Sequence, residues 1–428
     1  MERRKFIKQT AAGVAAFTII PATALGKNGA VPANSRINLA FIGTGKQGRI
    51  LQNFFKTQTE ETVTVAASDV DSQKLDLFTT LAEEANETRN SATKIFKTKH
   101  YRELLERSDV DAVVIATPDH WHAQAAIDAA KAGKDIYCEK PMALTVAEGR
   151  AMVNATRKYD RVFQTGNMQR SSYNFRQACE LVANGFIGEL KTINAGLGGP
   201  VVACDLPTME APDNLDWDLW VGPTLYRGYN PILSPPVEED IYPHWRRYRG
   251  FGGGAITDWG AHMFDIGQWG NQMDHSGPSV FIPPAPGKTH GLKMIYDNGV
   301  VMNHVELPYG NGVEFIGTDG RIEVTRGFLK TYPNEKLTQH EFKDSERKLY
   351  YSDNHYQDWL DAIKNRTRPI SDVEVGHRTS SVCNIANIAY ELERPLQWDP
   401  IDEEFLGDES ASLMLSRPFR GKWDFNDY

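Results

Sequence analysis

The sequence predicts an α/β protein of two domains, and three observations support this prediction. The chain has 428 residues, more than a single hydrophobic core ordinarily holds. Up to residue 160, short apolar runs alternate with helical patterns, which is typical of βαβ units that build a parallel sheet. Beyond it, a stretch rich in Gly, Pro and Trp at 196–254 precedes short β-type segments at 291–324, as in an antiparallel sheet.

The first domain, which we place at residues 36–160, contains the clearest elements. Buried parallel strands are predicted at four apolar runs, residues 37–42, 63–67, 110–116 and 135–138. Helices are predicted at residues 49–57, 122–132 and 145–158. Thr145 is the expected N-cap of the last of these helices, and Glu148 completes a capping box. The second domain takes residues 161–428, with helices expected at 355–365 and 376–392.

Composition argues against several classes of protein. A net charge of −9 speaks against nucleic acid as the main partner. Hydrophobic residues make up 41% of the chain and charged residues 24%, as in a globular protein and not in a disordered one. The 4 cysteines lie far apart and form no Cys-x-x-Cys pair. Buried free thiols are therefore favoured over a disulfide framework or a zinc cluster.

The first residues predict an export signal, which we place at residues 1–26. Arg3 and Arg4 precede an apolar stretch, residues 11–25, that ends in Ala-Thr-Ala. A basic start, a short apolar run and an Ala-x-Ala site are the parts of a signal peptide, and the run is too short for a stable membrane span. The arginine pair resembles the twin-arginine signal, although Glu2 replaces its usual Ser or Thr and general export stays open. We therefore expect the mature protein in the periplasm.

A glycine-rich turn follows the first predicted strand, and its pattern G-x-G-x-x-G is formed by Gly43, Thr44, Gly45, Lys46, Gln47 and Gly48. Such glycines allow a tight turn, close approach of a pyrophosphate and close packing of helix on strand. The helix N-terminus then attracts the phosphates. Asp69, at the end of the second strand, can bind the adenosine ribose and would repel a 2′-phosphate, which favours NAD over NADP. Lys46 and Ser68 could weaken that preference, and a glycine turn without a ligand is the alternative.

A lysine at the end of a parallel strand is the first catalytic candidate. Glu139-Lys140-Pro141 follows the strand at 135–138, at the edge where parallel sheets place their ligands. The ammonium group of Lys140 can act as a general acid or base, and Pro141 stiffens the backbone that carries it. Taken alone, a lysine at a strand end is more often a solvated surface residue.

A second group of candidates lies in the segment 252–265. From Asp258 onward the pattern is helical, which predicts Asp258, His262 and Asp265 on one helix face. A carboxylate and an imidazole one turn apart can bind a hydroxyl group and relay its proton. The same spacing could hold a metal ion, and an Asp N-cap beside a core histidine is the plainer alternative.

Together these motifs resemble the Gfo/Idh/MocA family of oxidoreductases, named for glucose–fructose oxidoreductase and inositol dehydrogenase. The resemblance rests on the glycine turn, on Thr117-Pro118 with His122, on Glu139-Lys140-Pro141, and on Asp258 followed by His262. Segments at 216–223, 245–246 and 417–423 are similar to an exported bacterial branch. The family implies a Rossmann dinucleotide-binding domain followed by an α/β domain with a large, mainly antiparallel sheet, which often packs in homo-oligomers.

The resemblance also implies roles for individual residues. Lys140 would lie near both the nicotinamide and the substrate, while Asp258 and His262 would bind and deprotonate the hydroxyl group as hydride leaves the neighbouring carbon. The nicotinamide side of the site would be lined by Thr117, Pro118, His122 and Glu139. The further candidates for the substrate pocket are Arg170 and Trp245.

The resulting hypothesis is an NAD-dependent dehydrogenase, without a metal ion, acting on a secondary hydroxyl of a sugar, cyclitol or glycoside. One offshoot of the family uses bound NAD to hydrolyse glycosides through a transient keto-sugar. Its members usually lack the lysine matched by Lys140, which favours the oxidoreductase. A sugar-binding protein without activity is the third alternative. Because free NAD is scarce outside the cytoplasm, we also expect the nicotinamide cofactor to be tightly bound.

Overall fold

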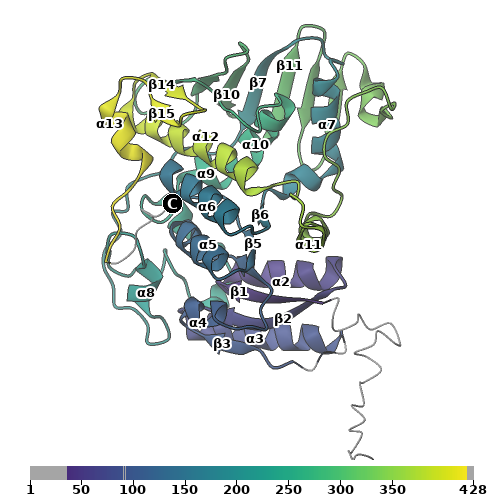
Figure 1. The fold of residues 1–428 in the computed structure, drawn as a ribbon. Coiled ribbons are helices and arrows are strands. Elements are labelled where there is room, and N and C mark those ends of the chain that lie inside the picture. Colours follow the sequence, from purple (N-terminus) through teal and green to yellow (C-terminus); the bar gives the residue numbers. More distant parts are fainter. Residues whose placement is uncertain (1–35, 90, 92, 422–428) are drawn as a thin grey trace, which may run out of the picture.

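Two sheets of different kinds dominate the protein (Figure 1). The computed structural model describes residues 36–421, except residues 90 and 92. The predicted export signal at 1–26 lies outside the described residues. Within the described part of the chain, no helix is both long and apolar enough to cross a membrane.

The first sheet is entirely parallel and has six strands in the order β3-β2-β1-β4-β5-β6. Its strands are β1 (Ile37–Ile42), β2 (Thr62–Ser68), β3 (Phe96–Thr98), β4 (Ala112–Ile115), β5 (Asp135–Cys138) and β6 (Phe163–Thr165). The four predicted strands are confirmed to within two residues at each end. The strand order reverses between β1 and β4, and at such a point a parallel sheet leaves a crevice beyond its carboxyl ends. This is the Rossmann arrangement that the glycine turn predicts.

Strand β6 corrects the predicted domain boundary. Ile136 pairs with Phe163, and Cys138 with Thr165, so the parallel sheet continues past residue 160. The strand has only 3 residues, which is too short to give a periodic pattern in the sequence.

Helices cover both faces of the parallel sheet. They are α2 (Lys46–Gln58), α3 (Ser72–Glu87), α4 (Tyr101–Leu105), α5 (His122–Lys131) and α6 (Val146–Lys158). In β1, Leu39 and Phe41 pack on the side of α2 and α3, while Ala40 and Ile42 pack on the side of α5 and α6. Thr145 caps α6 as predicted, because its Oγ1 accepts a hydrogen bond of 3.2 Å from the amide of Glu148.

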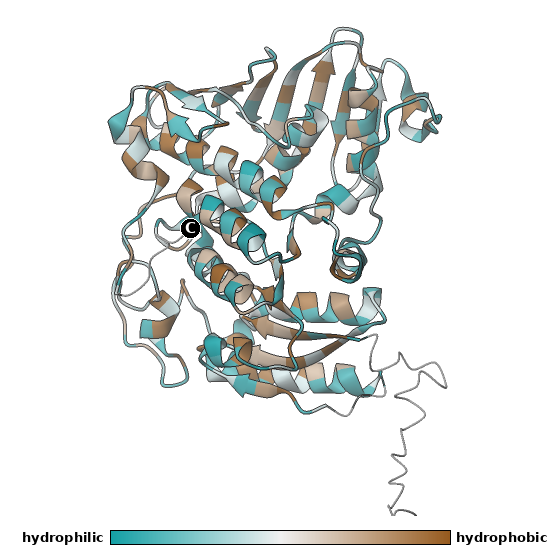
Figure 2. Ribbon diagram, in the orientation of Figure 1, coloured by the Kyte–Doolittle hydropathy of each residue, from teal (hydrophilic) through white to brown (hydrophobic). Residues whose placement is uncertain are grey.

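The second sheet has nine strands in the order β13-β12-β11-β7-β10-β9-β8-β14-β15, and only β7 and β10 pair in parallel. Its strands are β7 (Leu190–Gly196), β8 (Val280–Ile282), β9 (Lys293–Ile295), β10 (Val301–Val305), β11 (Gly312–Gly317), β12 (Arg321–Val324), β13 (Leu329–Tyr332), β14 (Leu396–Asp399) and β15 (Glu404–Phe405). Buried and less buried residues alternate along β10 and β12, and Figure 2 shows both hydrophobic and hydrophilic residues on the strands of this sheet. The expected large, mainly antiparallel sheet is confirmed.

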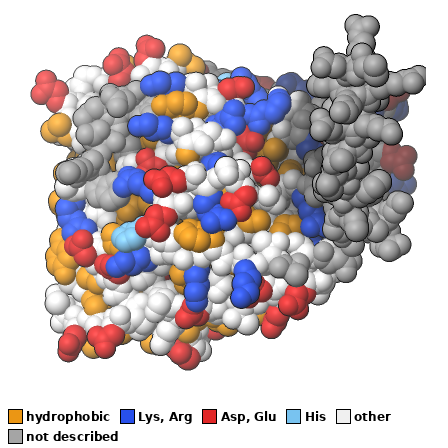
Figure 3. All heavy atoms as spheres, turned by 60° about the horizontal axis from the view of Figure 1, so that its bottom comes forward, with side chains coloured by type: hydrophobic (Ala, Val, Ile, Leu, Met, Phe, Trp, Pro, Cys, Tyr) orange, Lys and Arg blue, Asp and Glu red, His pale blue; other side chains and the backbone are white. Residues whose placement is uncertain are grey.

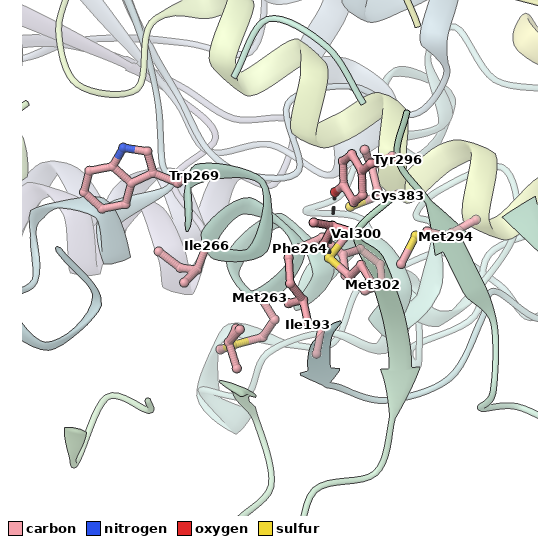
Figure 4. Packing of buried hydrophobic residues seen from close by; sticks show 14 of the residues in the cluster. Ile193, Met263, Phe264, Ile266, Trp269, Met294, Tyr296, Val300, Met302 and Cys383 are labelled. Atoms are coloured by element: carbon pink, nitrogen blue, oxygen red, sulfur yellow. Dashed lines mark hydrogen bonds between the residues drawn. The ribbon is translucent and has the colours of Figure 1, made fainter. Parts of the chain in front are cut away.

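One face of the second sheet is covered by helices α7 (Tyr173–Ala183), α10 (Gly260–Gly270) and α12 (Val373–Leu392). Figure 4 shows this core, in which Met263 and Phe264 of α10 lie among Ile193 of β7 and Met302 of β10. All of these side chains are fully buried. The cysteines are buried and free, as predicted.

Helix α11 (His355–Asn365) packs against the first domain although it lies far along the chain. The rings of Tyr356 and Trp359 lie 5.1 and 5.6 Å from the ring of Phe55 in α2. After the short helix α13 (Glu409–Ser412), Arg417 binds Glu148 of α6. The later part of the chain therefore returns twice to the Rossmann domain.

A long loop, residues 197–253, connects β7 to helix α9 (Gly254–Asp258) and lies against the carboxyl edge of the parallel sheet; we call it the crossing loop. It contains helix α8 (Trp217–Val221) and a small apolar core in which the rings of Trp217 and Trp220 stack at 4.5 Å. It is attached to the first domain by an ion pair of Lys99 with Asp216, at 2.9 Å. The composition predicts a loop-rich stretch here, but it does not predict this contact.

Side chains of both charges are interspersed over the Rossmann end of the molecule (Figure 3). Lys and Arg side chains lie among Asp and Glu side chains on that face, so neither sign of charge covers it alone.

Candidate active site

The glycine turn has the geometry that close backbone approach demands. Gly43 has φ +90°, and a Cβ atom there would lie 2.7 Å from the carbonyl carbon of Ala116. A Cβ on Gly48 would lie 2.4 Å from the carbonyl oxygen of Gly43, so α2 can pack this closely only with glycine. A Cβ on Gly45, by contrast, would meet no atom within 4 Å, and Gly45 lines a cavity. The turn thus leaves space where a pyrophosphate would approach.

Two further features of this βαβ unit suit a dinucleotide. Helix α2 has 13 residues and no side chain caps its N-terminus, so its first amides can bind a phosphate. At the end of β2, Asp69 Oδ2 accepts hydrogen bonds from N and Oγ1 of Thr44, at 2.7 and 2.9 Å. Its Oδ1 accepts one from the amide of Asp71, at 3.0 Å. Since a carboxylate accepts about four hydrogen bonds, a position remains for a ribose hydroxyl.

A cavity of about 290 Å³ lies between the glycine turn and the crossing loop. From the first domain it is lined by Gly43, Gly45, Lys46, Gln47, Asp69, Thr117 and Pro118, and from the crossing loop by Tyr242, Trp245 and Arg246. The buried Oγ1 of Thr117 has no hydrogen-bond partner within the described structure, and a bound ligand could supply one. Most of the residues predicted for the cofactor therefore border one cavity, which fits a nicotinamide dinucleotide.

The crossing loop is fastened to α2 beside this cavity. Lys46 Nζ and Arg49 Nη2 bind the carboxylate of Asp240 at 3.3 and 2.6 Å. The hydroxyl of Tyr242 donates to Gln47 Oε1 at 3.2 Å. The side chain of Asp240 is 62% exposed, so these contacts are weak enough to open and close.

Lys140 meets Asp258 beyond the end of β5, as the hypothesis requires. Its Nζ donates to the backbone oxygen of Asp258 at 3.0 Å and also to the carboxylate Oδ1. Burial alone would raise the pKa of Asp258, but the charges of Lys140 and Arg246 overcome this effect and lower the pKa. The two side chains remain 19% and 23% exposed, so the pair is open to a substrate. The Lys140–Pro141 peptide bond is cis.

Glu139 links this lysine to the glycine turn. Its Oε1 accepts a hydrogen bond from Gln47 Nε2 at 2.9 Å, and its Oε2 accepts one from the amide of Lys140 at 3.2 Å. Burial raises the pKa of Glu139, while the neighbouring Lys140 opposes the rise. Glu139 thus acts on the cavity through Gln47, which lines it.

His262 lies in the first turn of α10, close in sequence to Asp258. The residue is 4% exposed, and its Nδ1 has no hydrogen-bond partner within the described residues. Burial, aided by the charge of Lys140, lowers the pKa of His262 well below its usual range, so the ring is neutral. The predicted continuous helix is corrected here: α9 ends at Asp258 and α10 begins at Gly260, with Trp259 between them.

Asp265 does not share the open site, and Arg170 does not reach it. Asp265 is fully buried and accepts hydrogen bonds from Nε and Nη2 of Arg170, at 2.9 and 2.8 Å, and from Thr379 Oγ1 at 2.8 Å. Asp274 binds the same guanidinium at 2.7 Å, and Arg170 lies over the ring of Trp269. The predicted substrate role of Arg170 is therefore corrected to a structural one. The break before α10 and the roughly 10 Å rise along the helix segment carry Asp265 into the interior.

His122 holds the backbone and does not line the cavity. Its Nδ1 lies 2.8 Å from the carbonyl oxygen of Pro141, and its Nε2 lies 3.0 Å from that of Thr117. Burial lowers the pKa of His122 to about 4, so the ring is neutral and donates to one of the two oxygens. His122 therefore connects two turns of the site, whereas the resemblance implied direct contact with the nicotinamide.

The structure adds Arg246, which the sequence reasoning did not single out. Its Nε lies 3.8 Å from Asp258 Oδ1, and its guanidinium lies over the rings of Trp245 and Tyr242 at 4.3 and 5.3 Å. Trp245, predicted for the substrate pocket, is 5% exposed and belongs to the small core of the crossing loop. Trp245 thus supports Arg246 at the cavity wall. Arg246 directly follows Trp245 in the Trp-Arg segment at 245–246, and this position could have indicated it from the sequence.

Two more charged residues near Lys140 also escaped the sequence reasoning. Asp119 directly follows Thr117-Pro118, is 3% exposed, and its Oδ2 has no partner within the described structure. Burial raises the pKa of Asp119 well above its usual range, against the charge of Arg246. Arg326 lies over the Trp259 ring at 5.0 Å and had no motif to mark it.

Among the described residues, no group of three His, Cys, Asp or Glu side chains could hold a metal ion.

Comparison with protein families identifies the chain. Residues 37–167 match the model of an oxidoreductase family with an NAD-binding Rossmann fold, and residues 200–425 match the model of the α/β C-terminal domain of the same family. The chain belongs to the Gfo/Idh/MocA oxidoreductases. The family predicted from the four motifs is thereby confirmed.

Three curated relatives show the range of this similarity. Myo-inositol 2-dehydrogenase of Thermotoga maritima is 33% identical over 153 residues, which are 36% of this chain and 42% of that protein. Levoglucosan dehydrogenase of Pseudarthrobacter phenanthrenivorans is 38% identical over 93 residues, 22% and 24% of the two chains. Glycosyl hydrolase family 109 protein 1 of Shewanella sp. strain ANA-3 is 40% identical over 93 residues, 21% and 20%. The alignments thus span less than half of each relative.

Solved structures share the fold over most of the chain. Aldose-aldose oxidoreductase from Caulobacter crescentus, in complex with glycerol, has a TM-score of 0.57 at 18% identity and covers 85% of this chain and 99% of that one. Levoglucosan dehydrogenase in complex with NADH has a TM-score of 0.56 at 18% identity, with the same coverage. At this identity the likeness concerns the fold alone.

Proposed function

We propose that this protein is a dehydrogenase that oxidises a secondary hydroxyl group of a sugar, cyclitol or glycoside with NAD. The observation that carries the proposal is the Lys140–Asp258 pair, which stays open beyond β5 beside the cavity at the glycine turn. The dehydrogenases of inositol and levoglucosan among the relatives support the same class of substrate. The nicotinamide, when bound, would supply the hydride acceptor.

NAD is proposed over NADP because Asp69 lines the cavity at the end of β2, where it would repel a 2′-phosphate. The two residues that could weaken this preference, Lys46 and Ser68, also line the cavity. Lys46 binds Asp240, and Ser68 is 3% exposed. Titrating the protein with both reduced cofactors should show tighter binding of NADH, and equal affinities would contradict this part of the proposal.

The residues themselves would handle the proton of the substrate. The carboxylate of Asp258 accepts a hydrogen bond from the reacting hydroxyl, and the neutral ring of His262 can take its proton. Lys140 has three donors, and Asp258 takes two of them. The third is left to bind the oxygen that gains negative charge as hydride leaves the carbon.

The test of this function measures hydride transfer directly. Purified protein loaded with NAD is incubated with a panel of sugars, cyclitols and glycosides, and the reduced nicotinamide is followed by its fluorescence. We expect reduction by at least one compound, and the matched surface variant Lys97→Ala should behave as the unchanged protein, since Lys97 only pairs with the exposed Asp76. Absence of reduction across the panel, with NAD bound, would overturn the proposal.

A glycoside hydrolase that uses NAD is the second candidate. It is favoured by the similarity of 93 residues of this chain, 40% of them identical, to the glycosyl hydrolase family 109 protein. Release of the aglycone from an aryl glycoside, without net reduction of bound NAD, would support it. The retained Lys140 favours the dehydrogenase, because members of the hydrolytic offshoot usually lack this lysine.

We further propose that the enzyme is exported to the periplasm and carries its cofactor with it. The export signal in the sequence supports the first half of this proposal. The second half is supported by the crossing loop, which binds α2 through Lys46, Arg49 and Asp240 beside the cavity. Native mass spectrometry of the protein purified from a periplasmic extract should find bound nicotinamide. A protein that stays in the cytoplasm, or one that arrives without a cofactor, would contradict the respective half of this proposal.

We also propose that the outer face of the second sheet joins copies of the chain. Apolar side chains there are only half-buried, among them Val301 and Val305 of β10 and Ile316 of β11. Asn303 of β10 and Glu314 of β11 lie among them on the same face, and a mixed, half-exposed face of this kind can join identical subunits. Sedimentation should show an oligomer, which Ile316→Lys should dissociate; a monomeric protein would refute the interface.

A further inference from the structure

An exposed arginine, Arg326, lies over the ring of Trp259, the residue that follows Asp258. Arg326 follows strand β12, and its guanidinium carbon lies 5.0 Å from the centre of the Trp259 ring. Within residues 36–421, leaving out 90 and 92, no carboxylate lies within ion-pair distance of it and no acceptor takes its hydrogen bonds. An arginine held on an aromatic ring keeps its planar fork of donors in place for a ligand.

The position of Arg326 relates it to both residues that would handle the substrate hydroxyl. Trp259 directly follows Asp258, and its ring meets that of His262 edge to face at 5.8 Å. The positive charge of Arg326 contributes to the lowered pKa of Asp258 and to that of His262. A group bound to Arg326 would therefore lie on the Trp259 side of these two residues.

The other charged side chains of the site are paired with one another and not with Arg326. Lys140 is neutralised by Asp258, and Arg246 lies 3.8 Å from the same carboxylate. Glu139 accepts a hydrogen bond from Gln47 on the cofactor side, and burial raises the pKa of Asp119, which favours its neutral form. The ionised carboxylate of Asp258 is thus shared by Lys140 and Arg246, and within the described residues Arg326 forms no ion pair.

We infer that Arg326 binds an anionic group of the substrate, so that the enzyme acts on an acidic sugar, with a carboxylate or a sulfate ester, in preference to a neutral one. Guanidinium binds such groups through two parallel charge-assisted hydrogen bonds. The Trp259 ring limits the side-chain freedom that binding would otherwise remove. This inference rests on the proposed function, because it assigns the substrate class of the same site.

The test compares three probes that differ only at one carbon: D-glucose, D-glucuronate and D-glucose 6-sulfate. Their binding to the NAD-loaded full chain is measured by calorimetry, for the unchanged protein and for Arg326→Gln. We expect at least one anionic probe to bind more than about 10-fold more tightly than D-glucose, as charge-assisted hydrogen bonds allow. In Arg326→Gln this advantage should disappear, while the affinity for D-glucose changes less than about threefold.

Two variants separate recognition from a structural effect. Arg107→Gln is the matched control, because Arg107 also lies over an aromatic ring, that of Phe96 at 4.7 Å, but on the surface of the Rossmann domain. It should bind every probe as the unchanged protein does. Arg326→Lys keeps the charge and should retain part of the preference for the anionic probe, which a merely structural residue would not produce.

The outcomes distinguish this inference from the proposed function. Equal binding of all three probes, no binding of either anion, or an equal loss for neutral and anionic probes in Arg326→Gln overturns the inference. If neutral sugars reduce the bound NAD in that case, the proposed dehydrogenase function holds although the inference of an anionic substrate fails. Binding of an anionic probe that depends on Arg326, with no NAD reduction by any sugar, supports the inference and overturns the dehydrogenase. The anion that binds more tightly identifies the carboxylate or the sulfate ester.

Discussion

Two carboxylate–cation pairs, whose carboxylates lie in the consecutive helices α9 and α10, differ in their access to solvent. Lys140 binds Asp258, and Arg170 binds Asp265. The first pair is 19% and 23% exposed, while the second is 2% and 0% exposed. A carboxylate bound to a cation therefore marks both regions, and only its access to solvent and cavity distinguishes a candidate active site from a structural contact.

The two pairs also differ in how completely their hydrogen bonds are used. The guanidinium of Arg170 binds Asp265 and Asp274, and Thr379 completes the shell of Asp265. A closed network of this kind stabilises a fold but leaves nothing for a ligand. Within the described residues Lys140 donates only to Asp258, in two hydrogen bonds, so its ammonium keeps a third donor for a ligand. Four predictions follow this contrast, and a fifth concerns the loop beside the cavity.

Removing the open pair should have the largest effect. In Lys140→Ala we expect turnover to fall about 1,000-fold, within the range for a lost general acid–base group. The free energy of unfolding should change little, and bound NAD should be retained. Reduction of NAD by the best sugar, measured beside native mass spectrometry, tests this; near-normal turnover would remove Lys140 from the chemistry.

Removing the closed pair should act on stability instead. In Arg170→Met, Asp265 and Asp274 lose their cation, and we expect a loss of about 3–5 kcal/mol in the free energy of unfolding. Turnover per folded molecule should stay close to normal. The control is Arg249→Met, whose partner Glu391 lies at the surface. Lost turnover with unchanged stability would return Arg170 to the substrate pocket, where the sequence placed it.

A third cluster lies between these extremes and should respond to pH. Arg150 of α6, 30% exposed, binds Glu374 of α12 and Glu403. Against the effect of burial, the bonds from Arg150 lower the pKa of Glu374 from 4.5 to about 2, and the bonds from His377 and Arg150 lower that of Glu403 to about 2. Because the pKa of these two carboxyls is lower in the folded protein than in the unfolded chain, their ionised forms stabilise the fold. This contribution to the free energy of unfolding is complete above pH 4.5 and disappears as the pH falls toward 2.

We therefore expect Arg150→Met to cost about 1–3 kcal/mol of unfolding free energy near neutral pH. The difference from the unchanged protein should shrink as the pH is lowered from 5 toward 2. Urea unfolding at several pH values measures it. A difference that stays constant over this range would show that Arg150 acts through packing and not through charge.

The open site should itself show a pH profile without the usual histidine step. The pKa of His262 is well below 6.5, so the ring stays neutral and able to take a proton as pH falls through that value. We therefore expect protonation of His262 to reduce turnover by less than about twofold between pH 8 and pH 6. An acid limb centred near 6.5 that is absent in His262→Gln would contradict the assignment.

The smallest effect is expected at the loop beside the cavity. Asp240→Asn weakens the solvent-exposed contacts of the crossing loop with Lys46 and Arg49. NADH dissociation should accelerate by less than about fivefold, because exposed ion pairs are weak. Stopped-flow displacement of NADH measures the rate. A rate that does not change would mean that the loop plays no part in holding the cofactor.

Local sequence was sufficient for much of the first domain because its signals are contiguous. Gly43 to Gly48 form one turn, and the strand that precedes Lys140 ends where its apolar run ends. The three-residue strand β6 was too short to be seen, which placed the domain boundary before it. In the second domain, the interruption at Trp259 was hidden, because both sides of it have helical patterns.

The sequence by itself determined the Rossmann unit and, through four ordered motifs, the family, since each motif depends on residues whose spacing is fixed along a few turns of chain. The pairing of Lys140 with Asp258, which lie 118 residues apart, was expected only from the resemblance and is made by the tertiary structure. Only the tertiary structure decided which charged residues share the site. It brought Arg246 from the crossing loop and Arg326 from the second sheet toward Asp258, and it closed Arg170 away with Asp265. Burial is set by segments distant in the chain, so no local pattern could separate the open pair from the closed one.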